Sequence, residues 1–347
     1  MFKFKKSKLL LATGLLTLAG AASAGYDIKL SEDDKISFGG YIKIDARYVD
    51  GNVPYRQFWA GSLLSGAGED KSQFNLFANE TRFNMKYSHG DVMGFIEMDF
   101  FGGGGNEIIS NSANPRLRHA FIKYQDVLVG QTWSTFMNTS AIAETADFAG
   151  PANGLVFIRQ GQVRYTMGNL QVALENPETF GGDTSQDSVP DVIAKYTVKG
   201  DWGNVSFGGL FRQLNVDANN SETSVGYSVA GRIKTVGKDD LRFQIHGGEV
   251  GRYVGVASAK DIVDGKVEET TSYIAAYRHF WNEDLRSTVA YGYAKADLSN
   301  AESTHWSANV FKNLTKQLAV GFEVGNFSRD DQDADSNYAQ LSLKYVL

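Results

Sequence analysis

The chain has 347 residues with 34 lysines and arginines, 40 aspartates and glutamates and no cysteine, giving a formal net charge of −6. The lack of cysteine excludes a disulfide framework, and the mild acidity gives no basis for a nucleic-acid partner. Many glycines and aromatic residues with only five prolines suit a fold of long strands.

The first 24 residues have the pattern of a secretory signal peptide. Lysines at positions 3, 5, 6 and 8 precede an apolar run over 9–19, and Ala22-Ser23-Ala24 supplies the small residues that signal peptidase accepts. The apolar run falls short of the roughly 20 residues that a spanning helix needs. We therefore expect export with cleavage before Gly25, one domain over 25–347, and no helical membrane protein.

The remaining chain alternates between apolar and polar residues, which indicates β-strands because side chains of a strand alternate between its two faces. In the last segment Leu341, Leu343 and Tyr345 share one face, and Ser342 and Lys344 share the other. The expected strands are 36–48, 74–88, 93–101, 116–125, 126–131, 157–168, 169–176, 190–199, 201–212, 222–235, 239–250, 270–281, 284–296, 302–313, 316–327 and 336–347.

Short and long connectors alternate between these sixteen segments. The short ones carry turn chemistry, as in Gly168-Asn169 and Lys199-Gly200-Asp201. This arrangement is typical of an all-β, 16-stranded antiparallel transmembrane β-barrel in the outer membrane of a Gram-negative bacterium, with its long loops outside the cell. A soluble β-sandwich is the alternative. The long connectors are 49–73, 101–115, 132–156, 177–189, 251–269 and 328–335.

Alternation also assigns side chains to the lumen, where basic residues outnumber acidic ones. A basic lumen would concentrate anions, although lumenal cations could instead only pair with acids and stiffen the wall. Arg116 and Arg118 fall out of phase, which indicates a β-bulge or a place at the rim. The inward cations are Lys43, Arg47, Arg82, Lys86, Lys123, Arg164, Lys195, Arg212, Arg232, Lys234, Arg242, Arg278, Arg286 and Lys344. The inward acids are Asp45, Glu80, Glu97, Asp99, Glu175, Asp191 and Glu323.

The connector 132–156 is long and apolar, and its only charges are Glu144 and Asp147. A surface loop would be more polar, so we expect this one to fold into the barrel and narrow it. Arg159 and Arg164 follow it directly, and could converge with Arg116 and Arg118 on a constriction. Guanidinium groups suit carboxylates because their planar fork reaches both oxygens.

Three runs, Pro115-Arg116-Leu117-Arg118-His119-Ala120, 128–136 and 159–166, together with 39–46, resemble the DcaP-like outer-membrane porins. The resemblance implies a homotrimer with an inward-folded third loop that passes small anions such as dicarboxylates and aromatic acids. It implies that Arg116, Arg118, Arg159 and Arg164 are pore-lining cations. The chain departs from the family in lacking a coiled-coil segment before the first strand and in ending at Leu347 rather than at an aromatic residue.

The sequence thus predicts a porin that performs no chemistry and holds no metal or cofactor, with outer-membrane lipid and lipopolysaccharide as its surroundings. The Asp331-x-Asp333-x-Asp335 run lacks the glycine and glutamate of a calcium loop. Alternatives are a sugar-permeable or general diffusion porin without strong anion preference, and an outer-membrane barrel hydrolase, for which no nucleophile and base stand together. The expected pore-lining residues are Arg116, Arg118, Arg159, Arg164, Arg47, Arg82, Lys43, Arg212 and Arg242.

Overall fold

The computed structural model describes residues 25–53, 67–106, 108–148, 150–255 and 259–347, so the expected signal peptide lies outside the described residues. One antiparallel sheet closes on itself, because β9 pairs with β10 and β20 pairs with β2. Within the described ranges no helix is long and apolar enough to cross a membrane. The expected β-barrel is confirmed.

The sheet contains 18 strands that occupy sixteen places around the wall. Strands β1 and β20 lie end to end along β2, and β3 and β4 lie end to end along its other edge. The strands are β1 (Tyr26–Lys29), β2 (Asp34–Gly51), β3 (Lys71–Phe77), β4 (Arg82–His89), β5 (Val92–Asp99), β6 (Arg116–Tyr124), β7 (Val127–Trp133), β8 (Arg159–Met167), β9 (Leu170–Glu175), β10 (Asp191–Gly200), β11 (Gly203–Asn215), β12 (Ser221–Lys234), β13 (Asp240–Gly248), β16 (Thr270–Phe280), β17 (Leu285–Ala296), β18 (Glu302–Asn313), β19 (Leu318–Arg329) and β20 (Ala334–Val346). A separate hairpin joins β14 (Ile262–Val263) to β15 (Lys266–Val267).

The expected continuous strand 74–88 is wrong, since the chain turns at 78–81 between β3 and β4. The amide of Thr81 donates to the carbonyl of Ala78, and the Thr81 hydroxyl bonds the backbone of Lys43. Thr81 is consequently buried. The turn sends the Glu80 side chain inward to the hydroxyl of Tyr41, 2.9 Å away. The small strand β1 was also not predicted.

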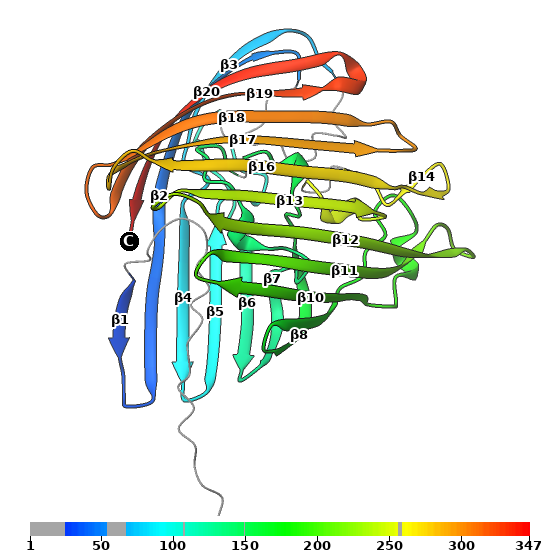
Figure 1. Cartoon of the computed structure of the whole chain (residues 1–347), viewed down its shortest axis with the longest axis horizontal. Coiled ribbons are helices and arrows are strands. Elements are labelled where there is room, and N and C mark those ends of the chain that lie inside the picture. The colour runs from blue at the N-terminus through cyan, green and yellow to red at the C-terminus, as the bar shows by residue number, and fades with distance from the viewer. Residues whose placement is uncertain (1–24, 54–66, 107, 149, 256–258) are drawn as a thin grey trace, which may run out of the picture.

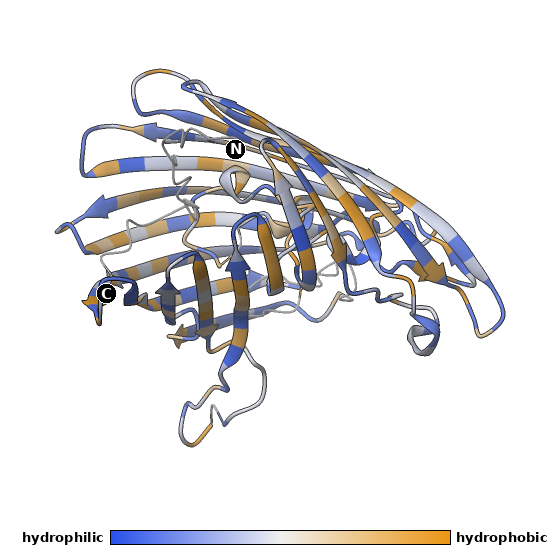
Figure 2. Ribbon diagram, turned by 90° about the horizontal axis from the view of Figure 1, so that it is seen from below, coloured by the Kyte–Doolittle hydropathy of each residue, from blue (hydrophilic) through white to orange (hydrophobic). Residues whose placement is uncertain are grey.

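The strands tilt strongly, so that β4–β6 run almost at right angles to β11–β13 in Figure 1. Hydrophobic and hydrophilic residues alternate along them, as Figure 2 shows. The short turns use residues with positive φ, such as Gly90 at 52° and Gly168 at 60°. Large exposed aromatics gather near these turns, as expected at a membrane interface. They are Tyr87, Tyr124, Tyr165, Trp202, Trp281 and Tyr345.

The apolar core lies inside the barrel. It joins buried side chains of the β7–β8 connector, among them Phe136, Met137 and Leu155, to inward residues of the wall such as Ile193 and Ile274. A packed core therefore fills part of the lumen. The aqueous path is left to the remaining part.

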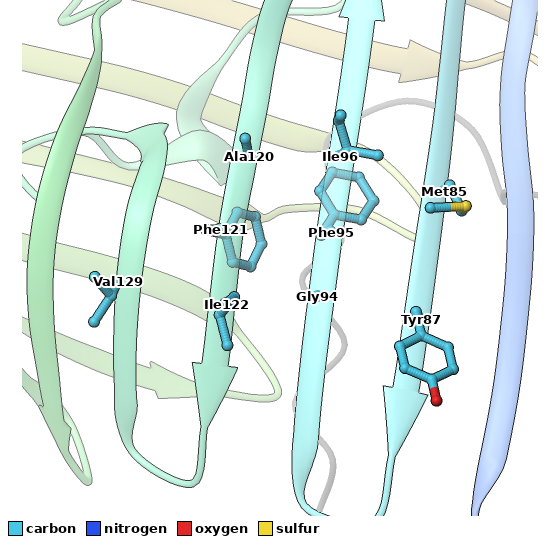
Figure 3. Close-up of a pocket in the computed structure, with 9 residues that line it drawn as sticks. All are labelled: Met85, Tyr87, Gly94, Phe95, Ile96, Ala120, Phe121, Ile122 and Val129. Carbon is cyan, nitrogen blue, oxygen red and sulfur yellow. The ribbon is translucent and has the colours of Figure 1, made fainter.

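A hollow of about 400 Å³ lies on the other side of the wall, over β4–β7 (Figure 3). Its lining includes the outward side chains of Tyr87, Ile122 and Val129. A side chain on Gly94 would meet no atom within 4 Å, so this glycine leaves the space open. The hollow is apolar and faces away from the lumen, which makes it no candidate for binding an aqueous solute.

Candidate functional site

The third long connector, residues 134–158, is folded into the barrel as expected; we call it the inward loop. Most of its described residues are buried, and it contains two short 3₁₀ turns, η2 (Thr139–Ala141) and η3 (Ala152–Gly154). Asn138 caps η2 by accepting from the amide of Ser140. The turns let a long segment follow the curved wall.

The first part of the inward loop is held by polar contacts to β10, β11 and β12. The Nζ of Lys195 donates to the carbonyl of Met137 at 2.8 Å. The side-chain amide of Asn138 donates to the hydroxyl of Ser206 at 2.9 Å and to the carbonyl of Ala230 at 3.0 Å. These contacts fix the loop against one wall.

Glu144 is the main ionic anchor of the inward loop. Its carboxylate accepts from Arg286 Nη2 at 2.7 Å and from Arg278 Nη1 at 3.1 Å. Burial alone would raise the pKa of Glu144, but the hydrogen bonds and charges of the two arginines outweigh it and lower that pKa. Glu144 therefore stays ionised at neutral pH.

Asp147, the loop's other acid, accepts from Arg47 Nη1 at 2.5 Å. Its pKa is raised, because complete burial outweighs the arginine. Glu323 of β19 accepts from the amides of Ala146 at 2.8 Å and of Asp147 at 3.1 Å. The tip of the loop is thus held by β2 and β19.

The return of the inward loop depends on one small residue of the wall. A Cβ added at Gly292 of β17 would lie 2.6 Å from Pro151 Cβ, so only glycine admits η3 here. Beside it, the side-chain amide of Asn153 donates to the carbonyl of Ser303 at 3.1 Å. These contacts hold η3 against β17 and β18.

A β-bulge in β6 explains the out-of-phase arginines. The pairing of β5 with β6 shifts register between Glu97 and Met98, so that Leu117 stays exposed while Arg118 and His119 are both buried. The extra residue reverses the alternation, and Arg116 and Arg118 both face the lumen. The expectation of a bulge is confirmed.

The two arginines of the bulge share acids of β5. Arg116 binds Asp99 in a bidentate pair at 2.7 and 3.0 Å. Arg118 donates to Glu97 at 2.8 Å and to Asp99 at 2.9 Å. Arg82 of β4 completes the group, with its Nε 3.6 Å from the same Glu97 oxygen that Arg118 binds.

Aromatic rings support this arginine group. The Arg118 guanidinium carbon lies 5.6 Å from the ring of Trp133 and 5.9 Å from Phe148 of the inward loop, and Arg116 lies 5.8 Å from Phe148. Arg159 lies over Trp133 at 4.8 Å. The loop and the wall meet at this point. We name the group after its expected role as the arginine constriction: Arg82, Arg116, Arg118 and Arg159 with Trp133 and Phe148.

Arg159 differs from its neighbours because the described residues provide no acid within salt-bridge distance. Its buried Nη1 lacks any hydrogen-bond partner, and it is repelled by the charges of Arg118 and Arg116. The cation–π contact with Trp133 supplies only part of the missing stabilisation. A carboxylate brought to Arg159 would supply the rest.

Arg164 was expected at the constriction, but its contacts are those of an anchor. Its Nε donates to Thr135 at 2.8 Å and to Gln162 at 2.9 Å, and its Nη2 donates to the carbonyl of Trp133 at 2.6 Å. It holds the point where the inward loop leaves β7.

Four further expected pore-lining residues are buried in ion pairs, and we correct that expectation. Lys43 binds Glu80 and the carbonyl of Ala146, and Arg47 binds Asp147 of the inward loop. Arg242 donates to Asp240 at 2.6 Å and to the loop carbonyl of Ile142. The fourth residue is Arg212, which binds other connectors. All four side chains are only 0–4% exposed and present no donor to a solute.

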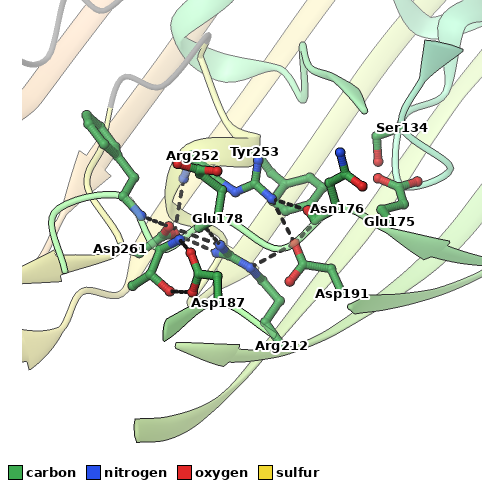
Figure 4. A network of polar contacts seen from close by, with 12 residues as sticks. Ser134, Glu175, Asn176, Glu178, Asp187, Asp191, Arg212, Arg252, Tyr253 and Asp261 are labelled. Atoms are coloured by element: carbon green, nitrogen blue, oxygen red, sulfur yellow. Dashed lines mark hydrogen bonds and ion pairs between the residues drawn. The ribbon is translucent and has the colours of Figure 1, made fainter. Parts of the chain in front are cut away.

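Arg212 belongs to a buried network at the extracellular ends of the strands (Figure 4). It binds Asp261 in a bidentate pair at 2.6 and 3.0 Å and Asp191 at 3.2 Å. Arg252 and Tyr253 donate to the same Asp191 oxygen at 3.0 and 2.7 Å. The network joins the 176–190 and 249–269 connectors to β10 and β11.

Sequence reasoning did not pair the lumenal cations with acids of the connectors. Glu144 and Asp147 enter the lumen with the inward loop, Asp261 of an expected outside connector is buried against Arg212, and Asp240 lies buried beside three arginines. The only available signal was that Glu144 and Asp147 are the sole charges of an apolar connector. Nothing in the sequence marked Trp133 or Phe148 as parts of the constriction.

Among the described residues, no cluster of three or more His, Cys, Asp or Glu side chains could hold a metal ion. No curated protein sequence matches the chain. Solved structures do, and three of them are outer-membrane proteins of other bacteria whose likeness supports the fold.

The DcaP channel of Acinetobacter baumannii is 24% identical with a TM-score of 0.77, over 92% of this chain and 99% of that one. OmpF of Salmonella typhi, in complex with daunomycin, is 14% identical with a TM-score of 0.61, over 93% and 100%. An anion-selective porin from Comamonas acidovorans is 12% identical with a TM-score of 0.60, over 91% and 100%.

The sequence itself matches the family described as DcaP outer membrane protein over residues 13–315, which is most of the chain. The expected resemblance is thereby confirmed, together with the sixteen-stranded outer-membrane channel fold. This chain belongs to the DcaP outer membrane protein family.

Proposed function

We propose that this porin lets small anionic solutes diffuse passively across the outer membrane through the arginine constriction, without performing chemistry on them. The observation that carries the proposal is the excess of positive over negative side chains at this constriction. The constriction holds four guanidinium groups, and the two carboxylates of Glu97 and Asp99 bind or approach three of them. Arg159 keeps an uncompensated charge beside the path.

The chemistry of the constriction favours carboxylates attached to small or flat groups. Arg159 offers donors in a planar fork that matches a carboxylate. Trp133 and Phe148 add apolar ring surface next to these donors. Dicarboxylates and aromatic acids combine both features, so they are the proposed substrate class. Binding must remain weak, because conduction requires release.

Planar-bilayer recording of the purified channel under a potassium chloride gradient tests this proposal. The expected reversal potential has the sign of chloride preference, and succinate and phthalate are expected to reduce the chloride current. A reversal potential of the cation-preferring sign would refute anion selectivity. A reversal potential near zero, with no block by either acid, would instead favour a general diffusion porin, in which the lumenal cations only pair with acids of the wall.

We also propose how the protein is processed and how its subunits assemble. The mature protein would begin at Gly25 after removal of the signal peptide, insert among outer-membrane lipid and lipopolysaccharide, and form a homotrimer. The apolar hollow over β4–β7 suits subunit contact better than the curved outer wall elsewhere. Native mass spectrometry of the detergent-extracted channel measures both features, since it gives the subunit mass and the number of subunits.

A further inference from the structure

A second group of cations lies around Tyr41 on the periplasmic side of the inward loop. Tyr41 points into the lumen from β2, where Arg82 is its partner on β4 and Val346 its partner on β20. The Arg82 guanidinium carbon lies 5.0 Å from the Tyr41 ring centre, and the Lys344 ammonium lies 4.0 Å from it. One ring therefore contacts two cations from different strands.

The acids nearby are already engaged. Glu80 accepts from Tyr41 through one oxygen and from Lys43 through the other. Asp45 accepts from the side chains of Ser342 and Gln340 and lies 3.4 Å from Lys43. Both carboxylates are thus engaged by other donors, and neither forms an ion pair with Lys344.

Lys344 lies opposite Lys43 in the pairing of β2 with β20. Like charges placed directly opposite each other destabilise a sheet unless a counter-charge relieves them. The two acids relieve Lys43, whereas within the described residues Lys344 has neither a hydrogen bond nor an ion pair with the protein. Its ammonium, half-buried in the lumen wall, keeps all three donors for another partner.

Arg82 is similarly available, although one acid approaches it. Its only neighbour within salt-bridge distance among the described residues is the Glu97 oxygen at 3.6 Å, and that oxygen already accepts from Arg118 at 2.8 Å. Its side chain keeps 14% of its surface exposed to the lumen. Through Glu97, the Tyr41 group is continuous with the arginine constriction.

We infer that Arg82 and Lys344, set against the Tyr41 ring, form a second carboxylate-binding site that receives an anion after it passes the constriction. The inference rests on the proposed function. A carboxylate bridging the two cations would relieve the Lys344–Lys43 repulsion, and the Tyr41 ring would keep the cations in place. Solute would then pass between two weak sites instead of leaving one strong site, which favours throughput.

Succinate block measured separately from the two sides of the oriented channel tests the second site. Since Lys344 lies two positions before Val346, the last residue of β20 at its periplasmic end, Lys344→Gln should weaken block by periplasmic succinate about fivefold, the effect of losing one close charge contact. Lys344→Arg keeps the charge and should restore the block. The chloride preference of Lys344→Gln should keep its sign, because the constriction is untouched.

Arg82→Gln supplies an independent variant in which periplasmic block should also weaken. Equal periplasmic block by wild type, Lys344→Gln and Arg82→Gln would overturn the second site, even in a channel that remains anion-selective. Failure of the proposed function gives a different result, because the wild type would then show a reversal potential of the cation-preferring sign. A correctly folded variant is recognised by the mobility of the folded barrel on an unheated gel, a readout that does not depend on the constriction to which Arg82 belongs.

Discussion

Removing the charge of Arg159 is the most direct perturbation of the constriction. An anion 4 Å from a guanidinium gains about 1 kcal/mol in bulk water and about 4 kcal/mol at an effective dielectric constant of 20. Its neighbours Arg116 and Arg118 are paired with Asp99 and Glu97, so they replace little of this attraction. Arg159→Gln should therefore lower the chloride-to-potassium permeability ratio at least about fivefold, the lower of the two limits.

The assay is the reversal potential of single channels under a salt gradient, compared among three variants. Arg159→Lys retains the charge and should keep most of the preference. Lys238→Gln removes an exposed charge in a periplasmic turn and should change nothing measurable. A permeability ratio of Arg159→Gln equal to that of the wild type, with normal conductance, would refute the idea that the uncompensated arginine sets selectivity.

Three further predictions concern the parts that hold the constriction. Because arginine contacts lower the pKa of Glu144, its anchor contributes stability above the ordinary carboxylate pKa of 4.5 and loses it only as pH falls below that value. Glu144→Gln removes the two ion pairs and should alter single-channel conductance already at neutral pH, where the wild-type anchor is intact. Gly292→Leu should expel the returning turn from the wall near Pro151 and raise the conductance of channels that insert. Arg212→Met leaves the buried Asp261 carboxylate without its arginine, which should cost about 3–5 kcal/mol and lower the temperature at which the barrel unfolds on a heated gel.

The barrel could be predicted from the sequence because lipid outside and water inside impose a period of two on every strand. The same rule failed where the backbone departs from regular pairing. The turn at 78–81 buries Thr81, and the bulge in β6 moves Arg116 and Arg118 to the lumenal face. The second departure was detectable, since two arginines on the lipid face would be too costly.

The ion pairs of the lumen could not be predicted in the same way. Arg212 binds an aspartate 49 positions away, and Arg286 binds Glu144 at a separation of 142. Alternation gives the face of a side chain but not the loop that meets it. A loop acid counted as extracellular can therefore neutralise a cation counted as pore-lining.

Because loop acids neutralise many lumenal cations, the number of basic residues in the lumen does not by itself give the strength of anion selectivity. Cations bound by buried acids, such as Arg47 and Arg242, contribute rigidity and almost no net field to a passing solute. Within the constriction, Arg159 is the arginine that no acid of the described residues reaches, so its charge acts most directly on the solute. Selectivity should accordingly respond steeply to substitution at Arg159 and weakly at the buried positions, where stability should respond instead. A lumen can thus carry many paired charges for strength while a few unpaired ones decide which ions cross.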